Sequence, residues 1–176
     1  MSDKYYTKLK APLLDYKSLY EKLVNKDSEL PWHSSAITYD FKLIKMSMTY
    51  VENNETLSAI YDKFKFSTYI FKLPANYNYN WHIDSDRGLS INMPLNNHIN
   101  SHTCFLTDDS LGSSNKFHRL DWDPGYFYLF NTQRMHSVLN LNEDRYFFSL
   151  TFDQNKHELS YEMVLNYCKE KELICQ

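Results

Sequence analysis

Side chains that could bind one metal ion occur at two places in the chain. His82 and Asp84 are two residues apart, His136 follows much later, and Arg145 comes shortly after it. Two imidazoles and one carboxylate on one face of an octahedral ion leave three positions open, which is typical of iron(II) sites that activate dioxygen. An arginine beside such a site could bind a carboxylate through two hydrogen bonds. These residue types therefore indicate oxygenase chemistry.

The spacing of the first pair suits a β-strand. Residues two apart in a strand point to the same face, so His82 and Asp84 can meet one ion while Ile83 points to the opposite layer. A histidine two residues before an aspartate is common by chance, so the pair alone is a weak signal. The prediction depends on what surrounds the second histidine.

The surroundings of His136 favour a position at the rim of a β-barrel. A Pro124-Gly125 turn precedes an aromatic strand at 126–130, a polar loop follows, and the next strand begins at His136. A histidine that opens a strand after such a loop lies at the edge of a sheet. His136 can therefore return to the pair upstream.

Arg145 opens a second aromatic strand, at 145–152. A buried arginine is costly unless an anion lies beside it. The sequence leaves two candidates for that anion. One is the carboxylate of a bound co-substrate, and the other is a protein carboxylate such as Asp84 or Asp153.

The elements that position these residues are mainly β. An amphipathic helix is predicted at 15–26, with Asp15 as its N-cap, and a second helix at about 160–173. No helix is predicted between them, where aromatic and β-branched residues alternate with turn residues. The clearest strands are at 67–73, 89–95, 126–130 and 145–152. This order predicts a jelly roll with flanking N- and C-terminal helices.

Composition narrows the class of protein. A chain of 176 residues with 43% hydrophobic and 16% aromatic residues suits one globular domain, residues 1–176. The 19 basic and 22 acidic residues create no strong positive field, so nucleic acid is disfavoured as a partner. No secretory segment and no apolar run of about 20 residues is present, so we expect a cytoplasmic protein with no membrane partner.

The order of the motifs resembles a known family. The matching residues are His82-x-Asp84, Ile91-Asn92-Met93-Pro94-Leu95, His136-Ser137-Val138-x-Asn140 and Arg145. Over about residues 79–153, the chain resembles the small iron(II)/2-oxoglutarate-dependent oxygenases of the aspartyl/asparaginyl/proline hydroxylase type. The resemblance implies a cupin-like double-stranded β-helix with its core at about 37–153.

The same resemblance implies roles for the site residues. His82, Asp84 and His136 would bind iron(II), and Arg145 would bind the distal carboxylate of the co-substrate 2-oxoglutarate. With dioxygen, the enzyme would hydroxylate a C–H bond of an amino acid, a peptide side chain or another small substrate, and release succinate and carbon dioxide. A retained carboxylate at Asp84 favours hydroxylation, since halogenating relatives leave that coordination position to a halide.

One strand departs from the family pattern. Several members carry an arginine and a histidine on the strand that matches 89–95, whereas this chain has Ser90 and Asn92. Arg87 is nearby but out of register with that pattern. The sequence therefore does not identify a second anchor for the co-substrate.

Two alternatives remain open at this level. His136-x-x-x-Asn140 resembles the second motif of cupins, which include metal enzymes that do not use 2-oxoglutarate, although the first cupin motif is absent. The same residues could also form an ion-pair cluster in a non-catalytic jelly-roll module. Trp81 could line the pocket or only pack in the core, and residues 107–116 could form a lid or an ordinary mobile loop. His98 and His102 are expected to be solvated loop residues and not additional ligands.

Overall fold

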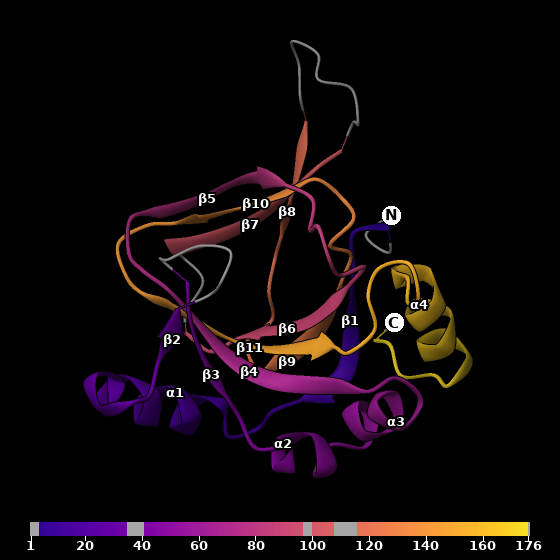
Figure 1. Ribbon diagram of the computed structural model, residues 1–176, viewed down its shortest axis with the longest axis horizontal. Helices are drawn as coiled ribbons and strands as arrows, with labels where there is room; N and C mark the ends of the chain where they lie inside the picture. Colours follow the sequence, from indigo (N-terminus) through magenta and orange to yellow (C-terminus); the bar gives the residue numbers. More distant parts are fainter. Residues whose placement is uncertain (1–3, 35–40, 97–99, 108–115, 176) are drawn as a thin grey trace.

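Two antiparallel sheets stack face to face (Figure 1). The computed structural model describes residues 4–34, 41–96, 100–107 and 116–175. In these ranges the larger sheet has the strand order β1-β9-β6-β11-β4-β3-β2, and the smaller one has the order β5-β10-β7-β8. The predicted mainly β, jelly-roll architecture is confirmed.

The strands of the larger sheet come from all parts of the chain. They are β1 (Tyr6–Pro12), β2 (His33–Ser34), β3 (Lys42–Lys45), β4 (Phe66–Leu73), β6 (Ser90–Pro94), β9 (Tyr126–Phe130) and β11 (Arg145–Phe152). The smaller sheet contains β5 (Tyr77–His82), β7 (Ser101–Leu106), β8 (Phe117–Leu120) and β10 (His136–Asn140). The predicted strands at 126–130 and 145–152 have the bounds of β9 and β11.

Helices cover the outer face of the larger sheet and one end of the sandwich (Figure 1). They are α1 (Tyr16–Asn25), α2 (Thr49–Glu52), α3 (Glu55–Lys63) and α4 (Tyr161–Glu170), with a 3₁₀ turn at Asp27–Glu29. The two predicted flanking helices, α1 and α4, are confirmed.

The expectation that no helix lies between the flanking ones is wrong. The short helices α2 and α3 interrupt the strands, and α3 buries Leu57 and Ile60 completely. Leu57, Ile60, Tyr61 and Phe64 follow helical spacing after the cap residue Asn54, so the sequence contained a signal for α3 that the prediction overlooked. The strand β1 was also not predicted, although Leu9 and Ala11 alternate with exposed lysines.

The main hydrophobic core lies between the larger sheet and the helices. Along β11, Tyr146, Phe148, Leu150 and Phe152 belong to this core. The residues between them point the other way, into the space between the two sheets. Because the apolar face packs outward, the inner face is free to hold polar groups and a cavity.

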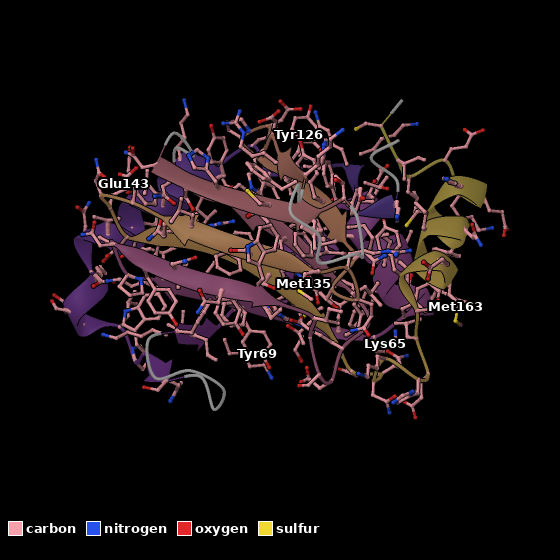
Figure 2. All side chains as sticks on the ribbon, turned by 90° about the horizontal axis from the view of Figure 1, so that it is seen from above. Lys65, Tyr69, Tyr126, Met135, Glu143 and Met163 are labelled. Carbon is pink, nitrogen blue, oxygen red and sulfur yellow. The ribbon has the colours of Figure 1, made fainter. Side chains whose placement is uncertain are left out.

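Figure 2 looks down on the smaller sheet. Glu143 lies at one end of the sandwich and Met163, on α4, lies at the other. Tyr69 and Tyr126 mark the two long edges. No helix in the described part of the chain is long and apolar enough to cross a membrane.

The N-cap of α1 differs from the expectation, and α3 has an N-cap that the sequence analysis did not consider. Asp15 makes no side-chain hydrogen bond to the first turn of α1, so its predicted capping role is wrong. At α3, the side chain of Asn54 accepts a hydrogen bond from the amide of Leu57 at 3.1 Å and donates one to the carbonyl of Pro12 at 3.1 Å. Asn54 therefore joins α3 to β1.

We predict that Asn54→Ala lowers the free energy of unfolding by about 1 kcal/mol, the usual cost of a lost N-cap. Asp15→Ala is the matched control and should change it by less than about 0.5 kcal/mol, because no cap bond is lost. Urea denaturation of both variants measures the difference. Equal effects of the two substitutions would contradict the assignment.

Candidate metal centre

His82 and His136 face each other across one antiparallel strand pair. β5 ends at His82, β10 begins at His136, and the two residues are partners in the β5–β10 register. Their ring centroids lie 4.1 Å apart. His136 is buried and His82 is half-buried, so the pair lies just inside the edge of the smaller sheet.

Asp84 completes the cluster from the turn after β5. Its backbone amide donates to the carbonyl of Thr132 at 3.1 Å. Its Oδ1 lies 3.4 Å from Nε2 of His82 and 3.9 Å from Nε2 of His136. The candidate ligand atoms all lie within 4.8 Å of one another. The predicted convergence of these three side chains is confirmed, and small side-chain movements would bring all three atoms onto one ion.

Backbone carbonyls orient both imidazoles. Nδ1 of His82 lies 2.6 Å from the carbonyl of Asn80, and Nδ1 of His136 lies 2.8 Å from the carbonyl of Arg134. A carbonyl can only accept, so each Nδ1 carries a proton, and each Nε2 faces Asp84. Such a partner on the outer nitrogen is typical of histidines that bind metals. These partners could not be named from the sequence.

The ionisation states also suit a cation. Burial, together with the nearby His82 ring, lowers the pKa of His136 to about 4. Burial by itself would raise the pKa of Asp84, but the hydrogen bond to His82 and the charge of Arg87 lower it to about 2. At neutral pH the site therefore contains a neutral His136 and an ionised Asp84, which are the forms that coordinate metals.

Arg87 holds the second oxygen of Asp84. Its Nε donates to Oδ2, the oxygen that faces away from the two histidines. The turn between them is fixed to the loop before β10. Thr132 Oγ1 donates to the carbonyl of Arg87 at 2.7 Å, and Gln133 Nε2 donates to the carbonyls of Asp84 and Arg87 at 2.9 Å. Sequence reasoning missed this role, although an arginine three residues after a candidate ligand was a usable signal.

Arg145 is buried between the two sheets at the start of β11. Nη1 donates to Ser101 Oγ at 3.0 Å and to Thr103 Oγ1 at 3.2 Å, and Nη2 also donates to Thr103. The rings of Trp122 and Phe147 lie within 5.8 Å of the guanidinium carbon. Burial lowers the pKa of Arg145 to about 10, so it stays charged at neutral pH.

No carboxylate neutralises Arg145 within the described ranges. Neither Asp84 nor Asp153, the two protein candidates, forms an ion pair with it there, and its Nε has no hydrogen-bond partner. A buried guanidinium with an unused donor is costly unless an anion binds beside it. The first alternative from the sequence, a bound carboxylate, therefore fits this position.

A cavity of about 450 Å³ joins Arg145 to the metal centre. Its floor contains a hydrogen-bonded chain in which Ser149 Oγ donates to Asn92 Oδ1 at 2.7 Å and Asn92 Nδ2 donates to Ser90 Oγ at 2.8 Å. This chain occupies the strand where the sequence departs from the family pattern. Ser90 and Asn92 therefore supply hydroxyl and amide groups to this part of the cavity.

The expectations for Trp81, the two loop histidines and the suggested lid have different outcomes. Trp81 is 46% exposed and does not line the cavity, whereas Trp122 does. His102 lies in β7 and not in a loop, because β7 begins at Ser101. His98 and most of the suggested lid, residues 108–115, lie outside the described residues.

Comparisons with known proteins support the fold. No family model matches the sequence, and no curated protein matches it. Among solved structures, a Pseudomonas putida prolyl-4-hydroxylase is similar at 15% identity, with 87% of this chain and 95% of that chain covered and a TM-score of 0.64. HygX from Streptomyces hygroscopicus, with nickel, 2-oxoglutarate and hygromycin B bound, is similar at 9% identity, with 87% and 84% covered and a TM-score of 0.59.

A third similar structure binds a peptide. It is a prolyl hydroxylase from Trichoplax adhaerens in complex with a fragment of the hypoxia-inducible factor oxygen degradation domain, at 12% identity, with 78% of this chain and 77% of that chain covered and a TM-score of 0.57. At such low identities these likenesses establish the shared double-stranded β-helix fold, and function must be argued from the site itself.

We predict that His82→Ala, Asp84→Ala and His136→Ala each weaken binding of iron(II) or manganese(II) by roughly 100-fold or more, because each removes one ligand atom. Calorimetric titration under argon measures the affinity, and circular dichroism checks the fold. His157→Ala, at an exposed histidine, is the control. Undiminished affinity in any of the three variants would exclude that residue as a ligand.

The lowered pKa of His136 predicts a pH dependence of stability. Above pH 6.5 the imidazole is neutral in the folded and unfolded chains. Between pH 6.5 and about 4 only the unfolded chain takes up the proton, so the metal-free protein loses stability as the pH falls. This residue should contribute a loss of about 2 kcal/mol between pH 7 and pH 5.

The variant His136→Asn should remove that part of the pH dependence, while His157→Asn should retain it. Urea denaturation in the presence of a chelator, at pH 7 and pH 5, measures the free energy of unfolding for all three proteins. Identical changes with pH in the wild-type protein and His136→Asn would show that His136 is not held neutral by the fold.

Proposed function

We propose that this protein is an iron(II)- and 2-oxoglutarate-dependent dioxygenase that hydroxylates a C–H bond of an amino acid, a peptide side chain or another small substrate. The observation that carries the proposal is that one cavity is lined by His82 and Asp84, which cluster with His136, and by Arg145, which has no neutralising carboxylate in the described part of the chain. The shared fold of the hydroxylases described above supports it.

The donor set fits iron(II). His82 and His136 offer Nε2 atoms and Asp84 offers Oδ1, so these three residues would hold the ion through two imidazoles and one carboxylate. When bound there, iron(II) together with 2-oxoglutarate and dioxygen would supply the oxidising power for the hydroxylation. The chain itself supplies ligands, orientation and protection from water.

Arg87 keeps Asp84 in the right orientation for this role. Because Nε of Arg87 donates a hydrogen bond to Oδ2 of Asp84, Oδ1 is the oxygen that faces the histidines. A carboxylate held this way binds an ion through one oxygen and leaves the remaining positions for other ligands. Gln133 and Thr132 reinforce the arrangement by fixing the backbone on either side of the turn.

Arg145 provides the binding site for the distal carboxylate of 2-oxoglutarate. Ser101 and Thr103 hold two of its nitrogens from the smaller sheet, so little side-chain entropy is lost when an anion binds. The aromatic faces of Trp122 and Phe147 keep water from the guanidinium. In this dry environment a charge-assisted hydrogen bond is strong and directional.

The two alternative functions predict different properties of the site. A cupin-type metal enzyme without 2-oxoglutarate gives Arg145 no anion to bind, although the guanidinium is buried with an unused donor. A non-catalytic module would require the Arg87–Asp84–His82 cluster only as an ion-pair network, and such a module would show no tight metal binding. The geometry favours the oxygenase over both.

The direct test is anaerobic addition of iron(II) and then 2-oxoglutarate, monitored for the visible charge-transfer band of a chelated keto-acid. We predict that Arg145→Gln weakens 2-oxoglutarate binding by roughly 100-fold and leaves iron(II) affinity within about threefold, since the charged partner of the distal carboxylate is lost. Arg119→Gln, at an exposed arginine, is the matched control.

Two results would contradict the proposal. One is the absence of the band in the wild-type protein with iron(II) bound. The other is an unchanged 2-oxoglutarate affinity in Arg145→Gln. Succinate release against panels of amino acids and peptides then identifies the substrate that is hydroxylated.

A further inference from the structure

Apolar side chains, most of them aromatic, line part of the cavity. We call this surface the aromatic trough, and it consists of Phe41, Leu43, Phe71, Tyr79 and Phe147. Phe71 and Phe147 stack at 5.3 Å, and Phe41 meets the edge of Tyr79 at 5.0 Å. All five are only half-buried, although they lie on inner faces of the sandwich.

The trough reaches the metal centre. The ring of Tyr79 lies 4.0 Å from the ring of His82. At its other side the cavity is lined by Tyr69, which lies at a long edge of the sandwich (Figure 2). An apolar group that covers these rings would therefore extend from the edge of the molecule to the proposed iron ligands, with a C–H bond beside the site of oxidation.

Arg87 lines the same cavity and has unused donors. Its Nε is bonded to Asp84, whereas its two Nη atoms have no hydrogen-bond partner in the described ranges. The side chain is 33% exposed. Its backbone is held by Thr132 and Gln133, so the guanidinium has a fixed position before any ligand arrives.

The charge of Arg87 is available to a substrate. Arg145 lies deeper and serves the co-substrate in the proposed function, so the two guanidinium groups need not compete for one anion. Asp86 also lines the cavity and would oppose an anion, but its side chain is exposed. Repulsion from an exposed carboxylate is screened by water, whereas paired hydrogen bonds from a partly buried guanidinium to a carboxylate are short and strong. The attraction of an anion to Arg87 therefore outweighs its repulsion by Asp86.

We infer that the substrate carries a carboxylate next to an apolar body of about the size of a phenyl ring. The carboxylate binds the Nη atoms of Arg87, and the apolar body lies in the aromatic trough. That this molecule is oxidised there rests on the proposed function, but the binding subsite itself does not.

The test uses three probes of equal length and different charge, which are 3-phenylpropionate, 3-phenylpropanol and 3-phenylpropylamine. Binding to the metal-free protein is measured by saturation-transfer NMR and calorimetry in the presence of a chelator. We expect the carboxylate to bind at least about tenfold more tightly than the alcohol, and the amine to bind most weakly.

Variants assign the contacts. Arg87→Gln should weaken the carboxylate by about tenfold or more and leave the alcohol unchanged within about twofold. Phe71→Leu should weaken both probes by a similar factor, because it removes ring contact without changing charge. Arg119→Gln is again the control, and thermal unfolding confirms that each variant is folded.

Three outcomes would overturn the inference. They are equal binding of the carboxylate and the alcohol to the wild-type protein, an undiminished affinity for the carboxylate in Arg87→Gln, and loss of the carboxylate in Arg145→Gln but not in Arg87→Gln. The last outcome would place the probe at the deeper arginine.

The failure of this inference is distinct from the failure of the proposed function. The probe experiment needs no iron, so Arg87-dependent binding without a keto-acid band would retain the subsite and reject the oxygenase. A normal keto-acid band with no probe binding would do the reverse.

Discussion

The pairing of β5 with β10 is the constraint on which the site depends. Their antiparallel register places His82 opposite His136, although the two residues are far apart in the sequence. The backbone also supplies a carbonyl two residues before each histidine, and these carbonyls orient both rings. A shift of the register by one residue would turn one imidazole to the opposite face of the sheet, and the cluster with Asp84 would be lost.

The two faces of the larger sheet pack against different surroundings, and this difference leaves space for the site. The apolar residues of β11 pack outward under the helices, so the main core does not need the space between the sheets. Arg145 can then be buried inside the sandwich with hydroxyl partners from β7. A conventional sandwich would fill that space with apolar side chains from both inner faces.

The charges in the cavity are one ion pair and one guanidinium that has no carboxylate partner among the described residues. Asp84 and Arg87 form a contact within one turn of chain, which keeps the carboxylate ionised and directed at the histidines. Arg145 has no such neighbour among the described residues and remains available to a small anion. In the proposed function, Arg145 would bind the co-substrate, and the unused nitrogens of Arg87 would bind the carboxylate of the substrate.

The sequence by itself determined the class of fold, both flanking helices, the bounds of β9 and β11, and the candidate set His82, Asp84, His136 and Arg145. These features follow from periodicity and residue type, which are local properties of the chain. The helix α2 has only four residues, too few for a periodic pattern, whereas the helical spacing of α3 was present in the sequence and was overlooked.

Only the tertiary structure decided how these residues are partnered. The contact of Gln133 with the Asp84–Arg87 turn, the chain from Ser149 to Ser90, and the lack of a carboxylate beside Arg145 in the described ranges all depend on residues distant in sequence. Such contacts arise from the stacking of two sheets. No local pattern encodes that geometry, because side chains from separate strands meet only after the strands have paired and the sandwich has closed.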